Sequence, residues 1–292
     1  MRSERRSGFT LLEMLVVVGI IVLLVSILLP VVGTVRKTAY QTRSANLVVK
    51  LATAINNYYN DFKAYPGPLS DDQLDNPNLT PPIQGLKGNV TGSENLVLGL
   101  LGGLKVQSTN GSIAYDASLV GKGPASINQL NPKLYSPYVD FNPSELSPMS
   151  TAGGTPTFMQ EGNMDSAVPE FMDAFPDPDT RPIIYARARV GATGVTTPAA
   201  GSPPNTKAQY NPKDASAYFM SPKPPDRFEP QTTFPLMFPD KRTVTADQFF
   251  GNPATIPQGQ TTPTDARGKD KFILIQAGKD RIFGTGDDYY YP

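Results

Sequence analysis

One carboxylate lies inside an apolar stretch that is long enough to enter a membrane. The stretch SGFTLLEMLVVVGIIVLL covers residues 7–24, and Glu13 is its only ionisable side chain. A charged group in lipid is costly unless it finds a partner, and such groups usually serve a function. We therefore expect Glu13 to be functional. The alternative is a glutamate that merely reaches out to the membrane surface.

A second group of carboxylates lies near the C-terminus. Asp280, Asp287 and Asp288 flank the sequence RIFGTG. Carboxylates on both sides of a two-glycine turn can converge on one point, and Ca²⁺ prefers roughly six to eight oxygen ligands. The spacing is not that of an EF-hand, and solvated aspartates in a turn are the alternative. Lys279 and Arg281 reduce the net charge of residues 279–288 to −1, which should weaken a cation site.

The composition excludes several classes of site. The chain has 292 residues, 26 basic and 26 acidic side chains, and neither Cys, His nor Trp. Disulfides, thiolate or imidazole metal sites and His-dependent catalysis are therefore excluded. A balanced charge also argues against bulk nucleic-acid binding. Of the 30 prolines, 28 lie between Pro66 and Pro263, so we expect the front of the chain to be helical and the middle to be broken into turns.

The apolar stretch predicts a membrane-spanning helix. Residues 14–32 contain no charge, and a spanning helix needs about 20 apolar residues. A cleaved secretory signal, the alternative, has an apolar core of about 7–15 residues and a small-residue cleavage site, which is not found here. Apolar residues then recur at three- and four-residue spacing as far as Phe62. We expect one helix over residues 11–63, kinked or locally melted at Pro30 and stopped by Pro66.

The remaining elements are predicted to be short. Residues 93–104 read as a small buried helix capped by Ser93. Residues 183–190 read as a strand, with 191–214 as a long hairpin connection and 215–221 as its return strand; residues 271–278 form the most strand-like stretch. The fold class is therefore α+β: a long N-terminal helix packed on a small antiparallel β-sheet, with long Pro/Gly-rich loops.

The N-terminus resembles the leader of type IV pilins and of type II secretion pseudopilins. The resemblance rests on RRSGFTLLEMLVVVGIIVLLVSILLP, in which a short basic leader ends in Gly8 and is followed by Phe9, Glu13 and the apolar run. It implies that a membrane peptidase cuts after Gly8 and that Phe9 becomes the methylated N-terminus. It also implies that Glu13 pairs with the new amine, usually that of a neighbouring subunit in a fibre.

Two further segments resemble the same family. FMDAFPDPDTRPIIY, residues 171–185, is similar to a packed turn that leads into its first strand. FILIQAGKDRIFGTGDD looks like the end of the major pseudopilin, where the corresponding loop binds calcium. The resemblance implies Ca²⁺ ligands at Asp280, Asp287 and Asp288, with carbonyls near Gly278 and Ile282. Arg281 stands where that family usually has glycine, which puts the ion in doubt.

The expected function is that of a type II secretion pseudopilin and not of an enzyme. Its expected partners are like subunits in a helical fibre, prepilin peptidase, the inner-membrane assembly platform and membrane lipid, with no nucleic acid. We expect a single pass through a bacterial inner membrane, with the N-terminus cytoplasmic and the C-terminal domain periplasmic. Arg2, Arg5 and Arg6 favour this orientation, but Arg36, Lys37 and Arg43 on the other side weaken the charge argument, so the orientation rests on the leader motif. The expected divisions are a leader (1–8), a transmembrane helix (9–35), its periplasmic continuation (36–65), a variable insertion with a short helix (66–170) and a C-terminal β-sheet region with a possible calcium loop (171–292).

Two alternatives stay open. A minor pilin of a type IV pilus or DNA-uptake fibre would share the N-terminus. A membrane-tethered enzyme or glycan-binding protein could use carboxylate pairs such as Asp71 with Asp72 or Asp177 with Asp179. These pairs lie in Pro-rich turns, and no nucleophile-elbow, P-loop or dinucleotide motif occurs.

Overall fold

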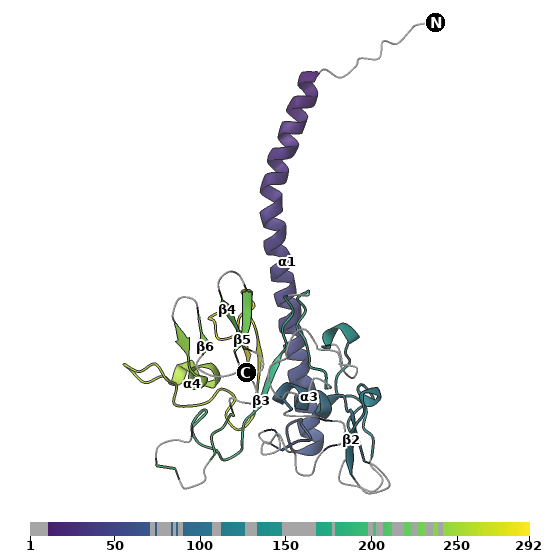
Figure 1. Ribbon diagram of the computed structural model, residues 1–292, viewed down its shortest axis with the longest axis vertical. Helices are drawn as coiled ribbons and strands as arrows, with labels where there is room; N and C mark the ends of the chain where they lie inside the picture. The colour runs from purple at the N-terminus through teal and green to yellow at the C-terminus, as the bar shows by residue number, and fades with distance from the viewer. Residues whose placement is uncertain are drawn as a thin grey trace.

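A computed structural model of the chain describes residues 11–70, 74, 83, 86, 90–106, 112–125, 133–147, 168–176, 179–197, 201–202, 207–211, 219–223, 227–231, 236–238 and 242–292. One long helix, α1, rises out of a globular part that is built from short helices and strands (Figure 1). The arrangement is α+β, as the sequence predicts.

Helix α1 covers Leu11–Phe62, 52 residues, or about 78 Å at 1.5 Å per residue. The predicted bounds are correct to within one residue. The helix ends where Lys63 adopts a left-handed conformation (φ 54°) just before Pro66. The helix is continuous through position 30 and bows only gently (Figure 1), so the predicted local melting at Pro30 is wrong.

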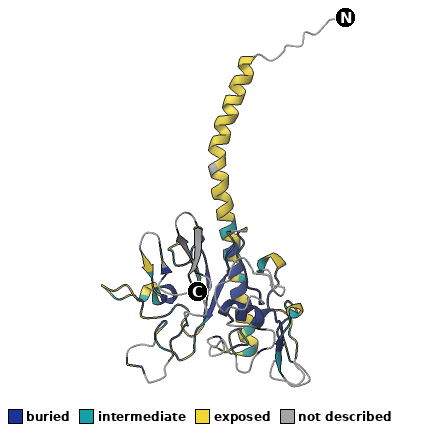
Figure 2. Cartoon of the chain, viewed as in Figure 1, coloured by how far each residue is buried: buried dark blue, intermediate teal, exposed yellow. Residues whose placement is uncertain are grey.

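The two halves of α1 have opposite surroundings. Its first half is exposed along its length, whereas the second half enters the globular part (Figure 2). The buried residues of the second half recur at three- and four-residue spacing, which gives the helix one apolar stripe. They are Leu47, Val48, Leu51, Ala52, Ala54 and Ile55.

Helix α3 (Gly92–Leu100) packs between α1 and strand β3, and all of its residues are buried. Its N-cap is Thr91, which forms a capping box with Glu94, and not Ser93 as predicted. Ser93 instead accepts a hydrogen bond from the Tyr185 N–H and donates one to the Ile183 carbonyl, both at 3.0 Å. Ser93 thus covers the open edge of the strand. A Cβ at Gly92 would lie 2.2 Å from the Tyr185 carbonyl oxygen, so this close approach requires glycine.

The central sheet has the order β3-β8-β9 and is antiparallel throughout. Its strands are β3 (Ile184–Arg187), β8 (Phe272–Gln276) and β9 (Tyr289–Tyr291). Ile184 pairs with Ile275, and Leu274 pairs with Tyr291. The strands predicted at 183–190 and 271–278 are confirmed, but residues 215–221 are not the partner of the first one. Strand β4 (Phe219–Lys223) pairs instead with β5 (Arg227–Gln231).

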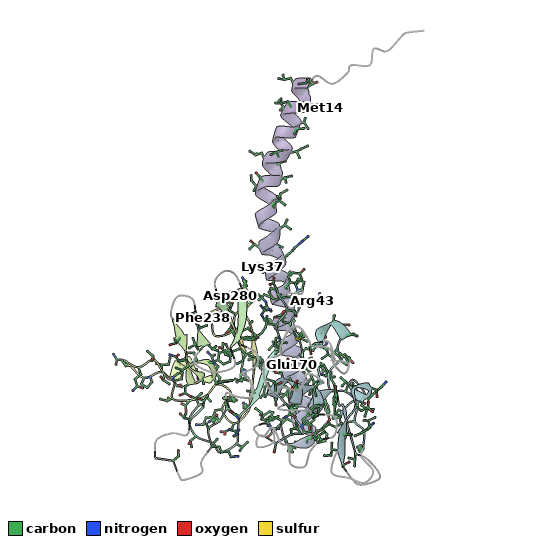
Figure 3. All side chains as sticks on the ribbon, in the orientation of Figure 1. Met14, Lys37, Arg43, Glu170, Phe238 and Asp280 are labelled. Atoms are coloured by element: carbon green, nitrogen blue, oxygen red, sulfur yellow. The ribbon has the colours of Figure 1, made fainter. Side chains whose placement is uncertain are left out.

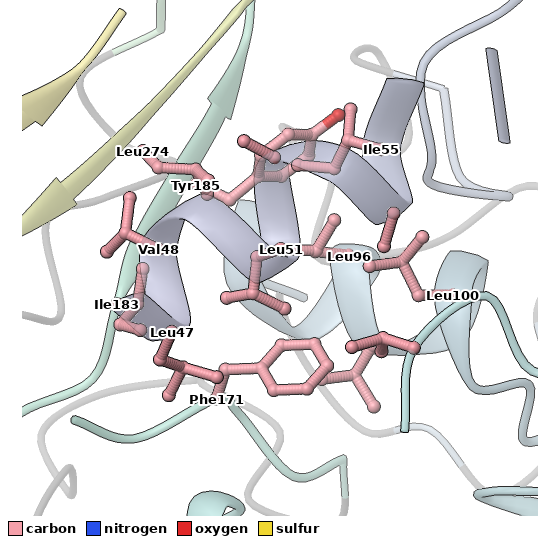
Figure 4. Packing of buried hydrophobic residues seen from close by; sticks show 14 of the residues in the cluster. Leu47, Val48, Leu51, Ile55, Leu96, Leu100, Phe171, Ile183, Tyr185 and Leu274 are labelled. Carbon is pink, nitrogen blue, oxygen red and sulfur yellow. The ribbon is translucent and has the colours of Figure 1, made fainter. Parts of the chain in front are cut away.

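Both faces of the sheet are covered. Phe272 and Leu274 of β8 belong to the cluster around α1 and α3, and Figure 4 shows Leu274 and Tyr185 beside residues of α1. The alternate residues Ile273 and Ile275 point into a second cluster with Phe250, which belongs to α4 (Ala246–Phe250). The sheet is therefore the middle layer of three, because successive side chains of a strand point to opposite faces.

The other elements are small. Strands β1 (Leu104–Val106) and β2 (Ile113–Tyr115) form one hairpin, and β6 (Leu236–Met237) pairs with β7 (Thr243–Val244). Short 3-10 turns lie at Ala117–Leu119, Pro143–Glu145 and Pro253–Thr255.

Candidate functional site

The first candidate region is the exposed half of α1. By length and composition this helix can cross a membrane, and none of its most apolar 18-residue window is buried in the globular part. A core helix of a soluble protein would instead be covered. Its one polar hydroxyl at mid-span, that of Ser26, donates a 2.7 Å hydrogen bond to the Leu23 carbonyl, which satisfies the group without water.

Glu13 lies in the first turn of α1 and is exposed. A carboxylate in this position is favoured by the partial positive charge of the helix N-terminus. Gly8 and Phe9, the predicted cleavage and methylation positions, lie outside the described residues. The predicted pairing of Glu13 with the Phe9 amine therefore stays a prediction.

The second candidate region is the C-terminal loop, residues 277–288 between β8 and β9, in which the backbone itself holds the carboxylates. Asp287 accepts hydrogen bonds from the Lys279 N–H at 2.6 Å and the Thr285 hydroxyl at 2.7 Å. Asp288 accepts from the N–H of Gly284 at 2.6 Å and of Gly278 at 3.3 Å. The loop therefore folds around its own acids.

The third acid of the loop, Asp280, is also satisfied locally, because it accepts a 2.9 Å hydrogen bond from the Ile282 N–H. Asp71, Asp72 and Asp177, which belong to the carboxylate pairs considered for an enzyme, lie outside the described residues.

The three acids of the loop differ in pKa. Burial raises the pKa of Asp288 to about 8, and the charges of Asp280 and Asp287 add to the effect. Burial likewise raises the pKa of Asp280, and Asp287 contributes. For Asp287, burial acts to raise the pKa, but hydrogen bonds from Thr285 and from backbone N–H groups outweigh it, so the pKa is lowered. Asp287 is therefore the acid of the loop that is most strongly held in its charged form.

A buried cation sits on the inner side of the same loop. The Arg281 guanidinium donates to the carbonyls of Ala277 (3.0 Å) and Gly278 (3.1 Å) through Nη1, and to that of Asp179 (2.7 Å) through Nε. Its Nη2 forms an ion pair with Asp173, and both side chains are almost fully buried. Sequence reasoning noted Arg281 as a departure from the resembled family but did not predict this ion pair.

The same cation connects the loop to α1. The Arg281 guanidinium lies 3.8 Å from the centre of the Phe175 ring. That ring in turn contacts Tyr40 of α1, with 5.6 Å between ring centroids. The Ala174 N–H also donates to the Ser44 hydroxyl of α1 at 2.9 Å. The predicted packing role of the 171–185 turn is confirmed, since Phe175 and Tyr185 are buried.

Two carbonyls of the predicted calcium site already have hydrogen-bond partners within the protein. The carbonyl of Gly278 is occupied by Arg281, and that of Ile282 accepts from the Thr285 hydroxyl at 3.0 Å. These hydrogen bonds compete with a Ca²⁺ ion for the same oxygens. Across the part of the chain that the structure describes, no group of three or more acidic, His or Cys side chains is arranged to hold a metal ion. Calcium binding by Asp280, Asp287 and Asp288 remains untested, and this donor set gives it no support.

Comparison with known proteins gives one match. The family described as Prokaryotic N-terminal methylation motif matches residues 4–29. No curated protein and no solved structure is significantly similar to the chain. The matched segment holds Gly8, Phe9 and Glu13 and extends into the exposed half of α1. The chain thus carries the N-terminal motif of a type IV pilin-like precursor, which implies processing by prepilin peptidase and assembly into a pilus-like fibre.

Proposed function

We propose that the protein is a pseudopilin, a structural subunit of a type II secretion pseudopilus. Prepilin peptidase cuts after Gly8, Phe9 becomes the methylated N-terminus, and subunits assemble through α1. The observation that carries the proposal is the methylation motif at residues 4–29, joined to a helix whose first half is apolar and exposed. In lipid, such helices associate through packing and polar pairs and not through a hydrophobic force.

Glu13 has a specific task in this proposal. Its carboxylate lies at the edge of the apolar run, where loss of water is costly unless a cation at the same depth neutralises it, and cleavage creates such a cation at Phe9. Pairing with the amine of a neighbouring subunit would fix the axial position of each new subunit. The leader arginines keep the N-terminus in the cytoplasm before cleavage, and the globular part then lies in the periplasm, beside the assembly platform.

A subunit of a type IV pilus is the second candidate, because the matched motif is shared by the whole superfamily. The similarity of FILIQAGKDRIFGTGDD to the end of a major pseudopilin favours secretion. Imaging of fibres in cells separates the two, since a short periplasmic fibre supports a pseudopilin and a long surface fibre supports a pilin.

Mass spectrometry of the protein from its native membrane tests the processing step. The expected mature chain begins with N-methylated Phe9 and lacks residues 1–8. Assembly is tested with Glu13→Leu, which should be cleaved and inserted but absent from fibres. Ser26→Ala, a change at another polar side chain of the same span, is the matched control and should assemble. An intact N-terminus, or normal fibres from the Glu13→Leu chain, would contradict the proposal.

A further inference from the structure

Three exposed cations follow the uncharged apolar run of α1, which ends at residue 35. Arg36, Lys37 and Arg43 are exposed, and Figure 3 labels Lys37 and Arg43 on the part of α1 that adjoins the globular part. We propose that these three residues, the cationic collar, bind the anionic headgroups of phospholipids such as phosphatidylglycerol at the point where α1 leaves the bilayer.

The charge of the collar is not neutralised within its own part of the chain. From residue 14 to residue 60 the sequence contains no Asp or Glu. The one other cation of this interval, Lys50, has a partner in Glu145 at 3.4 Å. Among the residues that the structure describes, no ion pair involves Arg36, Lys37 or Arg43. Within the described part of the chain, these three cations are therefore available to an anionic surface outside it.

The depth of the collar favours lipid. Residues 14–35 of α1 are uncharged and would span about 33 Å at 1.5 Å per residue, close to the roughly 30 Å of a hydrocarbon core. Arg36 and Lys37 then lie in the headgroup layer, about 5–7 Å thick on each side. The Phe175 ring contacts α1 at Tyr40, which is farther from the bilayer than Arg36 and Lys37, so these two cations lie on the membrane side of that contact.

The direction of the side chains extends this contact to Arg43. In an α-helix the Cα–Cβ bonds tilt toward the N-terminus, which for α1 is the side of the membrane. Arg43 lies seven residues after Arg36, two turns along the same face. Its long stem can therefore bring the guanidinium back toward the headgroups, and a guanidinium binds phosphate through two parallel hydrogen bonds.

One acidic element opposes this attraction. Because Arg281 stacks on Phe175 and Phe175 contacts Tyr40, the C-terminal loop with its exposed Asp280 and Asp287 lies toward the collar end of the globular part. An anionic surface would repel these carboxylates. At this end of the molecule the attraction to anionic lipid therefore comes from the cations of α1. We expect lipid binding to depend on the cationic collar and not on the net charge of the globular part.

The proposal rests on membrane anchoring by α1 and not on fibre formation. The test uses the full chain reconstituted in vesicles of phosphatidylcholine and phosphatidylglycerol. Flotation on a density gradient first shows insertion. Spin-labelled lipids of each type then report, by electron paramagnetic resonance, how strongly each associates with the protein.

The native chain should prefer phosphatidylglycerol by up to about fivefold for each cation engaged. The preference should fall toward unity in the triple variant Arg36→Gln/Lys37→Gln/Arg43→Gln and in 0.5 M salt, where the screening length is only about 4–5 Å. The matched control neutralises three exposed lysines away from the span and should keep the preference. It carries the substitutions Lys63→Gln, Lys122→Gln and Lys133→Gln.

Equal lipid preference in the native and the collar variant would overturn the proposal, as would an equal loss in the matched control. Loss of fibres without any change of lipid preference in the collar variant would show that the collar binds a second copy of the chain, and would also overturn it. A native chain that does not float with vesicles at all would refute the membrane anchor itself, a failure distinct from the other two.

Discussion

Replacing Arg281 tests whether an internal cation holds the C-terminal loop. In Arg281→Met the flexible apolar chain keeps part of the packing on Phe175, but the Asp173 carboxylate loses its ion partner while its side chain stays fully buried. Removing one member of a buried ion pair typically costs about 3–5 kcal/mol. Burial already raises the pKa of Asp173, against the attraction of Arg281, so uptake of a proton will limit the loss to the lower part of that range.

A loss near 3 kcal/mol is a large share of a typical folding free energy of about 5–15 kcal/mol. For a folded part of this size each kcal/mol lowers the melting temperature by about 2–4 °C, so we expect a decrease of roughly 10 °C. Thermal unfolding of the full chain in detergent, followed by circular dichroism, measures it.

Two matched variants make the experiment decisive. Lys279→Gln removes the same charge from an exposed position in the same loop and should change stability by less than about 0.5 kcal/mol. The double variant Arg281→Met/Asp173→Asn removes both charges but keeps an amide oxygen that can accept from the N–H groups of Phe175 and Arg181, so it should recover part of the loss. A single variant that melts within 2 °C of the native chain, or a double variant no better than the single one, would refute this reasoning.

Three further predictions follow from the same structure. Millimolar CaCl₂ or EDTA should leave the melting temperature of the native chain unchanged, because Arg281 occupies the Gly278 carbonyl; a calcium-dependent rise would restore the loop as a metal site. Phe250→Ala should cost about 3–5 kcal/mol in the free energy of unfolding, since Phe250 is fully buried in the second cluster, whereas Val190→Ala at an exposed side chain should cost little. Burial raises the pKa of Tyr210 and Tyr290 above the usual 10, so their neutral forms contribute stability that is present below about pH 10 and is lost as the pH rises further; of the signal from the 13 tyrosines, the last rise in tyrosinate absorbance, from these two, should coincide with unfolding followed by circular dichroism.

Helix α1 and strand β8 could be predicted because their own residues determine where each begins and ends. The uncharged run and Pro66 define the bounds of α1, and the apolar run at residues 272–276 defines β8. Strand pairing could not be predicted in the same way. Residues 215–221 were as plausible a partner for β3 as β8 is, because both are apolar and the choice depends on which faces α1 and α4 cover.

The candidate site was predictable only in part. Its N-terminal half follows from a motif with several coincident parts, which the family comparison confirms over residues 4–29. In the C-terminal loop, the acids at Asp280, Asp287 and Asp288 gave no sign that backbone N–H groups would bind them. The Arg281–Asp173 pair joins residues 108 positions apart. The sequence around Arg281 or Asp173 does not indicate that the two residues pair. Charged side chains in a turn can interact with solvent, with an ion or with a distant side chain, and the local sequence does not distinguish these cases.

Two long segments, the variable insertion at residues 66–170 and residues 191–270, contribute to the core. Residues 66–170 supply α3, whose Leu96 and Leu100 are buried against α1. Residues 191–270 supply Tyr210 and Phe250, which cover the second face of the sheet. All five residues of β8 are buried, whereas a strand covered on one face alone would alternate. Neither segment can therefore be a detachable arm. A surface of these segments that binds a partner must consist of their exposed residues. Substitutions that probe it should therefore leave the buried residues Leu96, Leu100, Tyr210 and Phe250 unchanged.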